Sequence, residues 1–124
     1  MFEFHAEYRT IKCGNKELNV RIVCEYEWET DLPDVEFESA EENEKYLKRF
    51  ETGELSNLWV KVTAISLILN ETVSGNLGGI HALTSDTENQ LMEAVKENQM
   101  IDDAVNQLVS NLENKYRALK GYFE

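Results

Sequence analysis

Apolar and polar residues alternate with a period of two in two runs near the start of the chain, over residues 2–11 and 18–28. This alternation is typical of half-buried β-strands. In the first run it predicts an apolar face and a polar face, formed respectively by Phe2, Phe4, Ala6 and Tyr8 and by Glu3, His5, Glu7 and Arg9. Gly14 and Asn15 lie between the runs and both tolerate positive φ angles, so an antiparallel hairpin is expected.

The next part of the chain leaves the strand pattern and begins a helix. Pro33 interrupts the alternation, because proline cannot donate a hydrogen bond to a strand ladder. Asp34–Glu38 alternates again but is short, which fits either an extended loop or an edge strand. Ser39–Glu42 has the form of a capping box with Ser39 as the N-cap, and the helix that it opens is expected to end at Gly53.

Two further strands are predicted in the second half of the chain. Residues 58–69 are apolar on both faces, which is typical of a central strand. Asn70–Gly75 predicts a turn, and Leu77–Leu83 predicts a short returning strand in which Gly78 and Gly79 favour a bulge.

The chain ends in two predicted helices. Ser85–Glu88 has the form of a second capping box and opens a short helix, which Asn98 and Gln99 are expected to break. Apolar residues from Ile101 to Leu119 then follow helical spacing, with Gly121 as the expected C-cap.

Together these elements predict an α+β fold in the order ββ-α-ββ-αα, with about four antiparallel strands and three helices packed on the sheet. The 124 residues fit a single domain, 1–124, and 42% of them are hydrophobic, as in ordinary globular proteins.

The sequence predicts a cytoplasmic protein. There is no run of apolar residues long enough to span a membrane, and the first residues lack the basic start and apolar block of a signal peptide.

In the predicted hairpin, Cys13 and Cys24 lie about 20 Å apart, at about 3.3 Å per residue along the strand. That distance is too long for a disulfide, so two reduced thiols are expected.

The charge of the chain is negative and locally concentrated. Twenty-four acidic and twelve basic residues give a net charge of −12, and from Cys24 to Glu44 there are ten acidic residues and no basic one. Such a surface favours a basic partner, although a solvated face kept for solubility is the alternative. The candidate partner-binding residues are Glu25, Glu27, Glu29, Asp31, Asp34, Glu36, Glu38, Glu41, Glu42 and Glu44.

Motifs that carry chemistry are not found in the sequence. His5 and His81 do not lie at metal-ligand spacing, and Gly75–Gly79 matches neither a P-loop nor a dinucleotide fingerprint. The acids of residues 31–38 lack the pattern of a calcium-binding EF-hand. We therefore expect no catalytic residue, no metal and no cofactor.

Direct binding to nucleic acids or membranes is not expected either, because phosphate affinity comes from clustered Lys and Arg. The acidic residues could instead imitate a phosphate backbone. Alternate residues on a strand stand about 6.6 Å apart, whereas phosphates advance about 3.4 Å per nucleotide. Glu25, Glu27 and Glu29 would therefore need a second acidic row, from Asp34 to Glu38 and the helix start at Glu41 to Glu44, to match that density.

The centre and the C-terminal part of the chain resemble small acidic proteins of bacteriophages and other mobile elements. The resembling motifs are Trp59–Ala64, Leu77-Gly78-Gly79, and Met100–Ala104 continuing to Leu108. Some proteins of this kind inhibit host defence or restriction complexes, as anti-CRISPR proteins do. The resemblance implies an anti-defence inhibitor in the cytoplasm of a bacterial host, and it assigns no binding residue.

The expected function is a non-enzymatic acidic inhibitor that blocks a basic, nucleic-acid-handling protein or nucleoprotein complex, with DNA mimicry as one means. An immunity protein against a basic nuclease toxin would need the same acidic surface. A phage structural or assembly protein would instead use the apolar stripe of the last helix, through which a homodimer could form.

Overall fold

A computed structural model describes residues 1–123 and has the predicted α+β fold. Within these residues the strands are β1 (Phe2–Cys13), β2 (Lys16–Trp28), β3 (Leu55–Ser66) and β4 (Glu71–Leu83). They form one antiparallel sheet in the order β1-β2-β3-β4. The helices are α1 (Ala40–Glu51), α2 (Thr87–Glu97) and α3 (Met100–Phe123), and a 3₁₀ turn, η1 (Thr84–Asp86), precedes α2.

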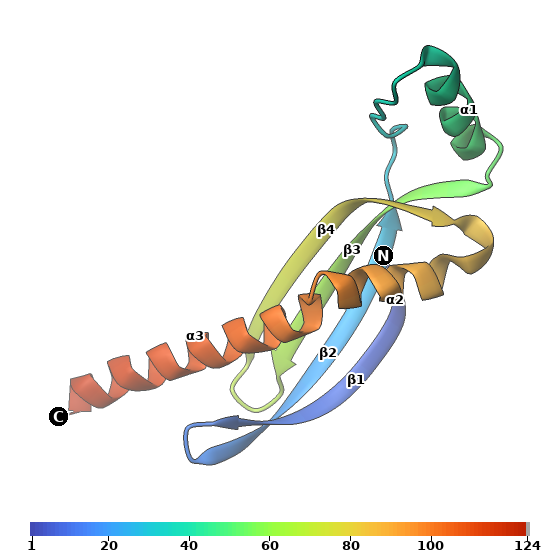
Figure 1. Ribbon diagram of the computed structural model, residues 1–124. Helices are drawn as coiled ribbons and strands as arrows, with labels where there is room; N and C mark the ends of the chain where they lie inside the picture. The colour runs from blue at the N-terminus through green and yellow to red at the C-terminus, as the bar shows by residue number, and fades with distance from the viewer. Residues whose placement is uncertain (124) are drawn as a thin grey trace.

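The two faces of the sheet differ in what covers them. One face, here called the helix face, packs against α2 and α3, which lie across it in Figure 1. Between these two layers is the main core, whose strand and helix members include Ile22, Val62 and Leu108, all fully buried. The opposite face, here called the open face, carries the strand side chains that alternate with those of the helix face. In the part of the chain that the structure describes, α1 contacts this face only at one end, as described below.

The predicted polar and apolar faces of β1 are wrong beyond its first residues. The pairing of β1 with β2 shifts register between Glu3 and His5, and this bulge exchanges the two faces. Phe4 therefore packs against the core, as predicted, but His5, Glu7 and Arg9 also lie on the helix face. Tyr8, which the simple alternation placed with Phe4, is 70% exposed.

The turn between β3 and β4 comes earlier than predicted. Residues 67–70 form it, with Asn70 at φ 50°, and β4 then runs for 13 residues from Glu71. The hydroxyl of Ser66 accepts a hydrogen bond from the amide of Leu69 at 3.3 Å, which closes the turn. The apolar residues Leu67, Ile68 and Leu69 are consequently exposed at its tip. The predicted bulge in β4 is confirmed by a register shift opposite Gly78 and Gly79.

The helix ends agree with the sequence in part. Ser39 caps α1 as predicted, accepting a hydrogen bond from the amide of Glu42 at 3.1 Å. Gln99, at φ 52°, separates α2 from α3. Ser85 does not cap α2, because η1 precedes this helix and Asp86 occupies the N-cap position. Gly121 is not a C-cap either, since α3 continues through it.

The last helix extends past the sheet (Figure 1). It runs antiparallel to β4, and Lys115 forms an ion pair with Glu71, the first residue of that strand. Its apolar stripe is buried as far as Leu112, whereas Tyr116 and Leu119 are 67% and 60% exposed. No helix within residues 1–123 combines the length and the apolar character needed to cross a bilayer.

Candidate functional site: an acidic lobe

The ten predicted partner-binding residues fall on three consecutive elements. Glu25 and Glu27 belong to β2, where the register places them on the open face. Glu29, Asp31, Asp34, Glu36 and Glu38 lie in the irregular segment that follows β2, and Glu41, Glu42 and Glu44 lie on α1. We call the end of β2 from Glu25, the segment 29–39 and α1 together the acidic lobe. Figure 1 shows the segment and α1 projecting beyond the sheet.

An aromatic cluster attaches α1 to the sheet. Tyr46 and Phe50 of α1 pack against the imidazole of His81 in β4, with ring centroids 5.7 and 5.1 Å apart. The Tyr46 hydroxyl and His81 Nδ1 share a hydrogen bond of 2.7 Å, and Phe37 packs on Tyr46 from the other side. Because His81 is in register with Asn57 on the open face, α1 lies on the same side of the sheet as Glu25 and Glu27.

The environment of His81 explains its role. Burial lowers the pKa of His81 from its ordinary value of 6.5, so the imidazole is mostly neutral at neutral pH. A neutral imidazole can share the hydrogen bond with Tyr46 and pack between two aromatic rings without burying a charge. His81 thus holds the lobe in place. The sequence showed only a lone histidine after two glycines, and its hydrogen-bond partner Tyr46 lies 35 residues away in the chain.

The acidic residues do not form two strand-like rows. Only Glu25 and Glu27 lie within a strand, and Asp34–Glu38 forms a loop and not an edge strand. The regular spacing of alternate strand residues therefore does not apply to the second set of acids. Glu29 turns across the sheet, with its carboxylate beside Gly78 of β4, where a Cβ atom would lie 3.5 Å from Oε1.

Little of the negative charge of the lobe is compensated. Within the described residues, the ten acids have two ion pairs: Glu27 with the N-terminal amine at 3.4 Å, and Glu41 with Lys45 at 3.5 Å. Lys61 stands opposite Glu25 in the sheet register. Arg49, the arginine of α1, forms an ion pair with Glu54, which is not one of the ten acids. Since exposed ion pairs are weak, the lobe keeps a strongly negative surface.

Apolar side chains are exposed among these acids. Leu32 and Phe37 in the irregular segment are 52% and 42% exposed, and Trp28, at the end of β2, is 47% exposed. Leu32 and Trp28 border a hollow of about 280 Å³ between the irregular segment, the end of α1 and the start of β3. Asn57 lines this hollow and has a buried Oδ1 atom with no hydrogen-bond partner among the described residues. The position of Leu32 beside Pro33 in a loop was the only sequence signal for these residues.

A second group of charged side chains lies on the helix face, next to β1. Arg9 donates hydrogen bonds to Glu7 at 2.8 Å and to Asp102 of α3 at 3.3 Å. His5 shares a hydrogen bond of 3.1 Å with Glu7. Burial raises the pKa of Glu7, but hydrogen bonds from Arg9 and His5 outweigh that effect and leave the pKa lowered. Arg9 thus pairs with both Glu7 and Asp102, and the cluster links α3 to β1.

The two cysteines form no disulfide, and neither they nor the histidines belong to a group of metal ligands within residues 1–123. Cys13 and Cys24 are both free thiols, as predicted, and burial raises the pKa of Cys24 to about 11, which keeps it protonated and unreactive. No group of three or more metal-ligating side chains is found within the described part of the chain.

Comparison with models of protein families, with curated proteins and with solved structures finds no match to this chain. The functional interpretation of the acidic lobe therefore rests on its own residues.

Proposed function

We propose that this chain is a non-enzymatic inhibitor whose acidic lobe occupies the basic surface of a nucleic-acid-handling protein or nucleoprotein complex, such as a host defence nuclease. The main support is the position of the ten acids, which lie together at one end of the molecule with few counter-charges. A surface of this kind attracts a basic partner over a distance and repels nucleic acid.

The exposed apolar residues support a docking surface over a face kept only for solubility. A protein interface gains most of its affinity from a few apolar or aromatic anchors surrounded by polar residues. Leu32 and Phe37 are such anchors within the acidic lobe, and Trp28 lies at its border, on the helix-face side of β2. A surface that served only solubility would not need exposed apolar side chains beside its acids.

Imitation of a phosphate backbone remains one means of inhibition within this proposal. It would depend on the irregular segment and α1 supplying the charges that the single strand row lacks. An immunity protein against a basic nuclease toxin would use the same lobe. The assembly alternative is favoured by a different observation, the exposed stripe of α3 at Tyr116 and Leu119.

The proposal is tested by displacement of DNA from basic partners. A fluorescent DNA duplex is bound to each of three probes: a restriction endonuclease, an RNA-guided nuclease complex and a nuclease toxin. We expect the wild-type chain to release the duplex from one of the first two, and to do so less well as salt is raised. Release from the toxin alone would favour the immunity alternative, and no release from any probe would contradict the proposal.

A further inference from the structure

The two edges of the sheet differ in the charge that protects them. An edge strand exposes unpaired N–H and C=O groups, which proteins usually guard with charged side chains, prolines or bulges. The edge strand β1 carries Glu3, Glu7, Arg9 and Lys12 and a bulge near its start. The other edge strand, β4, also has a bulge, at Gly78 and Gly79, but it has no acidic residue, lysine, arginine or proline from Thr72 to Leu83, in a chain with a net charge of −12.

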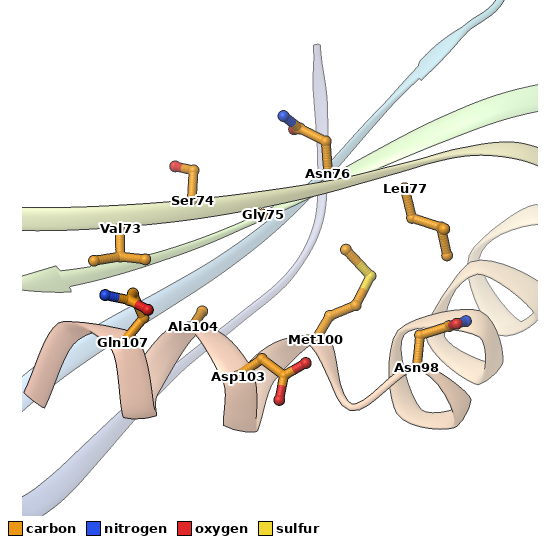
Figure 2. Close-up of a pocket in the computed structure, with 10 residues that line it drawn as sticks. All are labelled: Val73, Ser74, Gly75, Asn76, Leu77, Asn98, Met100, Asp103, Ala104 and Gln107. Carbon is orange, nitrogen blue, oxygen red and sulfur yellow. The ribbon is translucent and has the colours of Figure 1, made fainter. Parts of the chain in front are cut away.

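A groove follows this uncharged edge. It has a volume of about 350 Å³ and lies between β4 and the start of α3. Figure 2 shows Val73 and Leu77 of β4 directed toward the helix, where Met100 and Ala104 face them. On the opposite side of the strand, Ser74 and Asn76 point away from the helix and are exposed. The edge can therefore take a further strand, whose alternate side chains would enter the groove.

We propose that this further strand is β4 of a second copy of the chain, paired antiparallel about a two-fold axis at Gly75. In this register Val73 of each copy stands opposite Leu77 of the other, on the side of the groove. Ser74 likewise stands opposite Asn76 on the open face. Every contact is thus repeated by the symmetry, as a two-fold interface requires, and apolar residues meet apolar ones.

The same symmetry accounts for the exposed end of α3. Since α3 passes the start of β4 at Lys115, about eight residues continue for about 12 Å beyond it, at 1.5 Å per residue. In the antiparallel pair, the end of the second copy's β4 runs alongside the turn at residues 67–70 and beneath this extension. The exposed Leu67–Leu69, Tyr116 and Leu119 would then gain partners. Stable interfaces bury about 1,200–2,000 Å², more than one strand pair supplies, so this second contact is needed.

Electrostatics also favours a second copy in this orientation. Two chains of net charge −12 repel each other, and the uncharged edge of β4 is where they can approach most closely. Antiparallel pairing of the β4 strands places the two acidic lobes at opposite ends of a continuous sheet. Both lobes would remain accessible, so the dimer is compatible with the proposed inhibitor function and does not depend on it.

Charge pairs across the two-fold axis test the proposed register. Ser74→Glu/Asn76→Glu places like charges opposite each other twice, whereas Ser74→Glu/Asn76→Lys places opposite charges there. Tyr8→Glu/Thr10→Glu adds two acids with the same spacing on the open face of β1 and is the matched control. Sedimentation equilibrium measures the dissociation constant of each dimer, and thermal melting followed by circular dichroism verifies that each variant is folded.

We expect the wild type to dimerise, the like-charge variant to bind itself about tenfold more weakly, and the opposite-charge variant to return to near wild type. The β1 control should dimerise more strongly than the like-charge variant. The proposal is overturned if the wild type remains monomeric at about 1 mM, where even about 4 kcal/mol of association would be detected. It is also overturned if the like-charge variant and the β1 control weaken the dimer equally.

Salt dependence provides a measurement that needs no variant. Added salt screens the repulsion between two acidic copies, so it should strengthen the dimer, whereas it should weaken binding to a basic partner. A dimer that weakens as salt is raised would contradict the uncharged β4 interface. Since dimerisation is measured without any partner, its failure is distinct from failure of the inhibitor proposal. A wild type that stays monomeric but binds an extended peptide at β4 would also overturn the second-copy proposal.

Discussion

At the scale of single residues, His81 links the acidic lobe to the sheet, and its protonation should loosen that link. Burial lowers its pKa from the ordinary 6.5, so the unfolded chain takes up a proton at a higher pH than the folded one. The stability that His81 contributes is therefore present above about pH 6.5 and is lost as the pH falls through the lower, folded pKa.

Urea unfolding at several pH values below about 6.5 measures this effect. His81→Gln, which cannot take up the proton, should lose less stability on acidification than the wild type. His5→Gln is the matched control, because His5 lies next to Glu7 on the helix face and does not contact α1. If His81→Gln and His5→Gln followed the same pH dependence as the wild type, the role assigned to His81 would be wrong.

The adjacent glycines of β4 should respond differently to the same substitution. Gly79 has φ 68°, a conformation that costs a residue with a side chain about 1–2 kcal/mol, so Gly79→Ala should lower the free energy of unfolding by about that amount. Gly78 does not have a positive φ, and its added Cβ would make only ordinary contacts. Gly78→Ala should therefore change stability little. Equal losses in chemical denaturation would contradict this account of the bulge.

Some residue roles could be predicted from the sequence because they depend on neighbours in the chain. The Ser39 cap is of this kind, since it needs only Glu42, three residues later. The faces of β1 could not be predicted, because one extra residue at the bulge near Glu3 and His5 reverses the alternation. The attachment of His81 to Tyr46 depends on tertiary packing that no local pattern records.

At the scale of elements, the two serines in apparent capping boxes give a direct comparison. Ser39→Ala removes the cap of α1 and should lower its stability by about 1 kcal/mol. Ser85→Ala removes a hydroxyl that caps no helix, so a change below about 0.5 kcal/mol is expected. Amide hydrogen exchange in α1 and α2 measures local opening in each helix. Faster exchange in α2 after Ser85→Ala would contradict the assignment of Asp86 as N-cap.

The type and order of the elements could be predicted, but the ends of several could not. The strand β3 is apolar on both faces, so its pattern runs without a break into Leu67–Leu69, and only the turn geometry at Asn70 ends it. Likewise, Gly121 does not stop α3, because glycine costs a helix only about 1 kcal/mol relative to alanine. Neither end is marked by a residue that forbids continuation.

At the scale of the whole molecule, the sequence predicted the amount and the clustering of negative charge but not its arrangement. The ten acids lie within one segment of the chain, residues 25–44, so some proximity was expected. Their common position depends on α1 returning to the open face through Tyr46 and Phe50. The apolar residues beside them, including Leu32 and Phe37, became recognisable only once the fold showed that they lie outside the core.

The most direct test of the acidic lobe compares two variants with the same net charge in the DNA-displacement assay. Glu25→Lys/Glu27→Lys/Glu29→Lys alters the lobe, and Glu88→Lys/Glu93→Lys/Glu97→Lys alters exposed acids of α2. Each exchange adds two positive charges, so both variants change the net charge from −12 to −6. Circular dichroism verifies that both are folded.

The lobe variant should lose about a hundredfold in DNA displacement, because three interfacial charge reversals each cost about 1 kcal/mol or more. The α2 variant should remain close to the wild type. If both variants lost potency equally, total charge rather than the lobe would account for binding. If neither lost potency, the acidic lobe would not be the docking surface.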